Sequence, residues 1–217
     1  MEIPTESNEE DHTLWKQGEE AYKNSFNTGT TWKQLRQPSP TVPWWKAVWF
    51  KRAIPKHALI QWQASLGRLS TKDRLHRWGL QAETLCNLCS AEEESHQHLF
   101  FECSFSSSLW LHFANRLGTE PPLRLHLMPG WIEATDQGQN RYNHHRRTLT
   151  AITLQAAAYM LWRERNDRIF RSHGMPNDQL KHRLDRLVRN IILTGQSGPH
   201  QQKNHLLQVW FYLTRPP

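Results

Sequence analysis

The sequence has no long apolar run, few apolar residues overall and only three cysteines. Apolar residues make up 37% of the 217 residues, and no stretch approaches the roughly 20 apolar residues that a helix needs to cross a bilayer. Residues 1–11 are acidic and lack the basic and apolar segments of a secretory signal. We therefore expect an intracellular, nuclear protein that is not secreted and has no membrane partner.

Large aromatic rings compensate for the low apolar content, and positive charge is in excess. The chain contains 11 Trp and 8 Phe, and each such ring buries a large area, so a modest core is attainable. The net charge of +7 favours an acidic partner, most simply RNA or DNA. A basic surface without any partner explains the charge equally well.

The cysteines are concentrated in one short segment, residues 86–103, which we call the zinc hook. Cys86, Cys89, His98 and Cys103 form the pattern C-x2-C-x8-H-x4-C. Two cysteines three positions apart can bind one ion from a tight turn, and a returning segment supplies the other two ligands. Four protein ligands leave no position for water or substrate, so the pattern predicts one structural Zn²⁺.

Two alternatives to this ligand set are visible in the same segment. His96 lies within reach of the same ion, but we prefer His98 because it gives the four-residue gap to Cys103 found in zinc knuckles. Three buried cysteines without a metal are the other alternative, and their crowding in the least periodic part of the chain argues against it. The acidic run 92–94 is expected to be solvated, since hard oxygen donors suit a zinc–thiolate site poorly.

Apolar spacing and breaker residues predict a mainly α protein. The expected fold is an irregular helical domain with a small CCHC zinc hook, followed by a long helix and a C-terminal amphipathic helix. The sequence divides into a polar N-terminal segment (1–24), a zinc-binding domain (25–118), a loop or linker with Trp131 as an anchor (119–140) and a C-terminal helical region (141–217).

Local signals place most of the helices. Trp15 and Tyr22 are expected in a short helix, Ser70 and Asp73 are expected to cap another, and the aromatic residues of 44–50 are interpreted as core packing in preference to a base-stacking platform. The stretch after residue 199 is left undetermined. Further helices are expected from Thr30 to Leu35, from Pro55 to Leu66, from Ser104 to Leu117, from about 142 to 172, and through the apolar positions Leu180 to Ile192.

Four runs of the sequence, 44–59, 67–75, 86–103 and 159–170, together resemble the zinc-binding domain that follows reverse transcriptase in plant LINE-type (non-LTR) retrotransposons, and the segment after it. The resemblance implies a module that assists a polymerase acting on template RNA and target DNA. It also implies that the four hook residues named above are zinc ligands, because each stands at a matching position.

The parent polyprotein of that family is an RNA-directed DNA polymerase, but this chain lacks the residues for such chemistry. Polymerases hold two metal ions with paired aspartates, and the sequence contains no Asp–Asp pair. The carboxylates of an RNase H fold are not evident either. A cysteine hydrolase is disfavoured because zinc would occupy the candidate nucleophile. We therefore expect no enzymatic activity.

The leading hypothesis is a non-catalytic, zinc-stabilised nucleic-acid-binding module derived from a retrotransposon reverse transcriptase polyprotein. Basic side chains near the hook can neutralise phosphates and release counterions. Ordinary solvation is the competing explanation for each of them taken singly. The candidate phosphate contacts are Lys51, Arg52, Lys56, Arg68, Lys72, Arg74, Arg77, Arg146 and Arg147.

Two other hypotheses remain open. The zinc hook and the tryptophans could form a docking module for a polymerase domain, or the chain could be a degenerate retroelement fragment without selected activity. Nucleic-acid affinity that falls steeply with salt would favour the first hypothesis over docking.

Overall fold

The computed structural model describes residues 12–18, 21–42, 44–81, 83–118, 120, 124, 132, 141–194 and 200–214. The chain forms two compact units, Met1–Val42 (the N-terminal unit) and Pro43–Pro217 (the main unit). These are units of packing, and the four-part division made from the sequence stays a prediction. Trp131 and most of the predicted linker lie outside the described residues.

The N-terminal unit contains a short hairpin and one helix. Strands β1 (Trp15–Gln17) and β2 (Ala21–Lys23) pair antiparallel, with Lys16 opposite Tyr22. The prediction of a helix through Trp15 and Tyr22 is therefore wrong. Gly18, at φ 88°, takes the left-handed conformation between the strands, which glycine adopts without steric cost. Helix α1 (Thr28–Leu35) begins where the Asn27 side chain accepts a hydrogen bond from the Thr30 backbone N–H.

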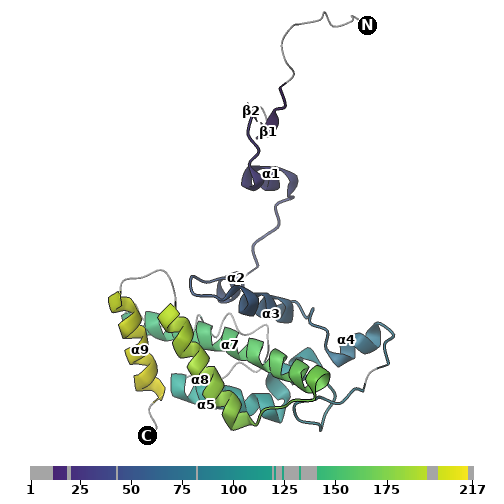
Figure 1. The fold of residues 1–217 in the computed structure, drawn as a ribbon, viewed down its shortest axis with the longest axis vertical. Coiled ribbons are helices and arrows are strands. Elements are labelled where there is room, and N and C mark those ends of the chain that lie inside the picture. Colours follow the sequence, from purple (N-terminus) through teal and green to yellow (C-terminus); the bar gives the residue numbers. More distant parts are fainter. Residues whose placement is uncertain are drawn as a thin grey trace, which may run out of the picture. The chain divides into compact units, whose positions relative to one another are not determined.

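The main unit is helical and built around one long helix, α7 (Figure 1). Helices α3, α5, α8 and α9 and the short helix η1 all pack against α7. The elements in chain order are α2 (Trp45–Val48), α3 (Pro55–Ser65), α4 (Lys72–Arg77), η1 (His98–Glu102), α5 (Ser104–Leu117), α7 (Arg141–Arg171), α8 (Asn177–Thr194) and α9 (His200–Thr214).

The middle of α7 is buried on nearly every side, as its central position requires. From Leu149 to Ala158 every residue is buried, including Thr150, Thr153 and Gln155. Gln155 joins α7 to the segment before it, because its amide donates to the carbonyl of Val48 (2.9 Å) and accepts from the backbone N–H of Ile54 (3.2 Å). The predicted long helix of 142–172 is confirmed.

Two further predicted helices have the expected buried faces. Helix α5 spans Ser104–Leu117 and ends at Gly118, whose positive φ of 64° suits glycine. Its predicted inward residues, Leu109, Trp110, Phe113 and Leu117, are all buried. Helix α8 buries Leu180, Leu184, Val188, Ile191 and Ile192, which is the apolar face that the three- and four-residue spacing predicts.

Helix α9, which the sequence left undetermined, covers α5 and α8. Trp210 is fully buried. Its ring stacks on Phe113 of α5 with centroids 6.1 Å apart, and its Nε1–H donates to Asp185 of α8 at 2.9 Å. One indole therefore fixes α9 against two other helices. No helix of the described residues is both long and apolar enough to span a bilayer.

Two local predictions are corrected. Trp45 and Trp49 are 40% and 47% exposed, so the interpretation of this cluster as core packing is wrong for both. Helix α2 is only one turn long, and it turns Ala47 and Val48 toward the core instead. At α4 the residue at the cap position is Thr71 and not Ser70, and the first two backbone N–H groups, of Lys72 and Asp73, are satisfied by Glu94.

Candidate metal centre

The first half of the zinc hook is a tight turn that presents two thiols. The backbone N–H of Ser90 donates to the carbonyl of Cys86 at 2.8 Å, and the N–H of Leu88 points at the Cys86 sulfur at 3.4 Å. Ser90 takes the left-handed conformation, with φ 56°. Backbone N–H groups directed at a sulfur favour the thiolate, which is the form that binds metal.

The second half of the hook is a wide helical turn, η1, which aligns His98 with Cys103. The backbone N–H of Cys103 donates to the carbonyl of His98 at 2.8 Å, a bond between residues five apart. In an α-helix, residues five apart point about 140° away from each other. The wider π turn brings the two residues to the same side, so the H-x4-C spacing and the π turn serve the same purpose.

The four side chains meet at one point. One donor atom from each of Cys86, Cys89, His98 and Cys103 lies within 4.8 Å of the others. The sulfurs of Cys86 and Cys103 are 3.9 Å apart, and the Cys89 sulfur is 3.3 Å from Nε2 of His98. A tetrahedral zinc with Zn–S bonds of about 2.3 Å separates its sulfurs by about 3.8 Å. The residues present therefore fit a zinc ion.

The charges at this point also favour a cation. Cys86, His98 and Cys103 are buried. Donation from its thiol to Cys103, together with burial, raises the pKa of Cys86. The same hydrogen bond lowers the pKa of Cys103. The hydrogen bond thus favours the thiolate form of Cys103, and a divalent cation bound at this point would stabilise both sulfurs as thiolates.

A carboxylate orients the histidine. Oε2 of Glu92 lies 3.2 Å from Nδ1 of His98. A proton on Nδ1 satisfies this contact and leaves the lone pair of Nε2 directed at the sulfurs, which is the arrangement common to zinc-bound histidines. The sequence gives no signal of this role for Glu92, because a carboxylate six residues before a histidine forms no recognised motif.

His96, the alternative ligand, points elsewhere. Its Nδ1 is 3.1 Å from Oγ1 of Thr71 at the start of α4, and burial lowers its pKa. The structure brings His98, not His96, to the three thiols.

The third residue of the acidic run, Glu94, is buried, and the expectation that it is solvated is wrong. Its Oε1 accepts the backbone N–H of Lys72 at 3.0 Å, and its backbone carbonyl accepts the N–H of Asp73 at 3.2 Å. The charge is balanced by Arg165 of α7, whose Nη2 lies 2.7 Å from Oε1 and whose Nε is 3.1 Å from both oxygens. Glu92 and Glu93 are exposed, as expected.

A second α7 arginine holds the cysteine turn. Arg168 donates from Nη1 to the carbonyls of Asn87 and Leu88 at 3.0 and 2.9 Å, and its guanidinium lies over the ring of Phe105. Its Nε pairs with Glu164 at 2.9 Å. Arg165 and Arg168 together attach the zinc hook to the central helix, and neither was predicted as a site residue.

The structure separates the predicted phosphate contacts into two groups. Lys51, Lys56, Arg68 and Arg77 are exposed, although Arg77 pairs with Asp73 at 2.6 Å.

The remaining candidates already have partners within the protein. Lys72 is buried and donates from Nζ to the carbonyl of Leu85 at 2.5 Å, which removes it from the candidates, because a basic residue in this position satisfies the protein's own carbonyl. Arg74 donates to the carbonyl of Gly67 and lies over the ring of Trp78. Arg52 donates to the carbonyl of Ile192, Arg146 donates to that of Gly118, and Arg147 is half-buried with a partner of its own.

A closed set of three thiols and one imidazole is the ligand set of structural zinc-binding domains. Residues 26–110 match the family model described as zinc-binding in reverse transcriptase. This segment of the chain is similar to that zinc-binding domain, and zinc is its cofactor.

The chain is also similar to an uncharacterized mitochondrial protein of Arabidopsis thaliana. The two are 35% identical over 77 residues, which cover 35% of this chain and 54% of that protein. The chain thus spans about half the length of this relative. No solved structure matches the chain.

Proposed function

We propose that the chain is a non-catalytic nucleic-acid-binding module from a retrotransposon reverse transcriptase polyprotein, held in shape by one Zn²⁺ on Cys86, Cys89, His98 and Cys103. The observation that carries the proposal is the closed ligand set, three of whose four members are buried, held by two arginines of α7. A metal with four protein ligands organises structure and leaves no position for a reacting group. The family match over residues 26–110 supports the origin.

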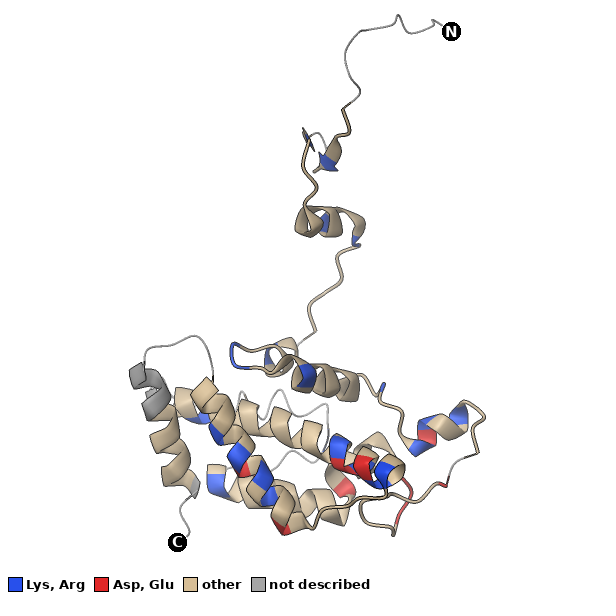
Figure 2. Ribbon diagram, viewed as in Figure 1, with Lys and Arg blue, Asp and Glu red and all other residues tan. Residues whose placement is uncertain are grey.

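Exposed basic side chains support binding to a polyanion. Lys51, Lys56 and Arg68 are exposed, and Figure 2 shows where Lys and Arg lie along the ribbon of the main unit. Long basic side chains on an exposed surface neutralise phosphates without base-specific contacts. The proposal is therefore for binding governed by phosphate charge, in an intracellular compartment where nucleic acid is present.

The test is the salt dependence of binding. Anisotropy titrations with labelled single-stranded RNA, single-stranded DNA and duplex DNA, at several salt concentrations, give a slope that counts the phosphates neutralised. A Lys51→Gln/Arg68→Gln variant is expected to weaken binding and to reduce that slope by about one or two. Lys181→Gln is the control, since Lys181 is already paired with Asp178 at 3.1 Å. Binding that ignores salt, or no binding, contradicts the proposal.

A second candidate function is docking to a reverse transcriptase domain. It is favoured by the exposure of Trp45, Trp49 and Trp78, of which Trp78 is 56% exposed, because exposed tryptophans are common at protein interfaces. A protein that binds no nucleic acid, but whose tryptophan fluorescence changes when the polymerase domain is added, would favour docking.

A further inference from the structure

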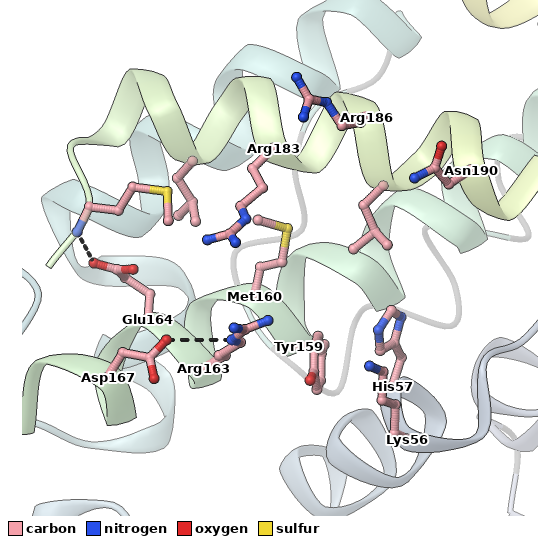
Figure 3. A pocket seen from close by; sticks show the side chains of 13 residues that line it. Lys56, His57, Tyr159, Met160, Arg163, Glu164, Asp167, Arg183, Arg186 and Asn190 are labelled. Atoms are coloured by element: carbon pink, nitrogen blue, oxygen red, sulfur yellow. Dashed lines mark hydrogen bonds and ion pairs between the residues drawn. The ribbon is translucent and has the colours of Figure 1, made fainter. Parts of the chain in front are cut away.

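A cavity of about 240 Å³ lies between α3, α7 and α8, away from the zinc hook (Figure 3). Its floor is apolar, formed in part by Met160, Leu180 and Leu187. Its rim is polar and is supplied by all three helices. None of the sequence motifs that gave the zinc site accounts for this cavity.

The lining carries a net positive charge. Four cationic side chains line the cavity against two carboxylates, Glu164 and Asp167, which leaves two positive charges in excess. Both carboxylates are already engaged. Glu164 pairs with Arg168 and accepts the backbone N–H of Met175 at 2.6 Å, and Asp167 pairs with Arg163 at 3.4 Å. The cations are Lys56, Arg163, Arg183 and Arg186.

Arg183 and Arg186 of α8 have no ion pair within the described part of the chain, and both are exposed. Figure 3 shows the guanidinium of Arg183 directed into the cavity, opposite Arg163, with Arg186 on the rim. A guanidinium binds phosphate through two parallel hydrogen bonds. The cavity therefore offers an unengaged anion-binding group above an apolar floor.

The wall toward α3 is aromatic. The ring of Tyr159 stacks on His57 with centroids 4.1 Å apart. Figure 3 shows Tyr159 standing between His57 and Lys56 on one side and Met160 and Arg163 on the other. His57 is 1% exposed, and its Nδ1 makes no hydrogen bond among the described residues. The face of Tyr159 that is turned away from His57, toward Met160 and Arg163, is a planar wall that suits the face of another ring.

We propose that this cavity binds one nucleotide unit of a single-stranded nucleic acid, with the phosphate on Arg183 and the base against Tyr159. The inference rests on the proposed function and names the form of nucleic acid. The cavity is smaller than the roughly 300 Å³ at which ligand pockets usually begin, so it can take one base, with the sugar-phosphate at its polar rim, but not a duplex. Bases offer their faces to an aromatic side chain only when they are unpaired.

The experiment compares full-length wild type, Arg183→Gln, Tyr159→Leu and the control Lys181→Gln. Each is titrated with single-stranded RNA, single-stranded DNA, a duplex of the same sequence and free AMP. Arg183→Gln and Tyr159→Leu are each expected to weaken single-strand binding about tenfold, with duplex binding and the control unchanged. Tyr159 is partly buried, so Tyr159→Leu could weaken binding by disturbing the packing of the core. Arg183 is exposed, so weaker binding by Arg183→Gln cannot be explained in that way.

A second measurement locates the bound base directly. Photo-crosslinking of a 5-iodouracil-containing strand to wild type, followed by mass spectrometry, is expected to label the peptide that carries Tyr159. Labelling elsewhere, equal affinity in wild type and Arg183→Gln, or equally effective competition by polyglutamate overturns the inference.

The outcomes for the two proposals are distinct. If wild type binds no nucleic acid, the proposed function fails and the cavity proposal fails with it. If wild type binds with a steep salt slope but Arg183→Gln and Tyr159→Leu change nothing, the cavity proposal alone fails.

Discussion

Arg165 of the central helix α7 and Glu94 of the zinc hook form a buried ion pair, with Nη2 and Oε1 2.7 Å apart. The two side chains are 3% and 0% exposed. Glu94 also accepts the first backbone N–H of α4. A single carboxylate thus connects the metal-binding segment, the start of α4 and the helix at the centre of the core.

Removing the arginine should be costly. In Arg165→Ala the Glu94 carboxylate stays buried without its partner, so we expect the free energy of unfolding to fall by about 3–5 kcal/mol. Urea denaturation measures this loss. The control is Arg163→Ala, which removes a half-exposed arginine paired with Asp167 in the same helix and should cost under about 1 kcal/mol. Equal losses in the two variants would show that the buried pair of Arg165 with Glu94 contributes no more to the free energy of unfolding than the exposed pair of Arg163 with Asp167.

Zinc binding should depend on His98 and not on His96. His98→Ala is expected to abolish stoichiometric zinc, measured by mass spectrometry of the metal after gentle purification, whereas His96→Gln should retain about one zinc per chain. Loss of zinc should also remove hydrogen-exchange protection across residues 84–110, because metal-binding energy is folding energy for so small a segment. Zinc retained in His98→Ala would refute the ligand set.

The carboxylate behind His98 should tune zinc affinity. Glu92→Gln keeps the size of the side chain but weakens the contact to Nδ1, so we expect zinc affinity to fall about tenfold. A competition titration against a chromophoric chelator measures the change. Glu93→Gln is the matched control, since Glu93 is exposed and next in sequence. The same decrease in both variants would show that zinc affinity falls because a negative charge near the site is lost, and not because the imidazole of His98 is no longer oriented.

The buried His57 should make stability depend on pH. Burial, followed by the charge of Lys56, lowers its pKa from 6.5 to about 4. As pH falls from 6.5 toward 4 the unfolded chain takes up a proton there while the folded chain does not, so the free energy of unfolding decreases, by at most roughly 3 kcal/mol. Above pH 6.5 the contribution is complete.

The difference between wild type and His57→Gln isolates this effect, because acid acts on the zinc ligands and on His96 equally in both proteins. The pH dependence of the urea midpoint should be flatter in His57→Gln. An exposed histidine, His76, provides the matched control variant His76→Gln. Parallel curves for wild type and His57→Gln would show that His57 is protonated normally in the folded protein.

The parts of the structure that depend on the spacing of nearby residues could be predicted from the sequence. The hook is visible because its four side chains lie within 18 consecutive residues. Helices α5 and α8 were predictable because their apolar residues repeat at helical intervals. The resemblance identified the domain, and the family match supports it.

Contacts distant in sequence were not predictable. Glu94 and Arg165 are 71 residues apart, and charged residues are by default assigned to the surface. Lys72 was misjudged for the same reason. Trp45 and Trp49 were assigned to the core from their hydrophobicity, but a single helical turn has room to bury only part of its surface. Helix α9 was missed because Trp210 is held by Phe113 and Asp185, neither of which is close in sequence.

The segment that matches the family model ends at residue 110, yet the core that supports it continues through α7, α8 and α9. A fragment that ends at residue 110 would expose the buried side of α3. It would also lose Arg165 and Arg168, which attach the zinc hook to α7. The zinc-binding segment is therefore expected to need α7, α8 and α9, or a substitute for them, in order to keep its fold.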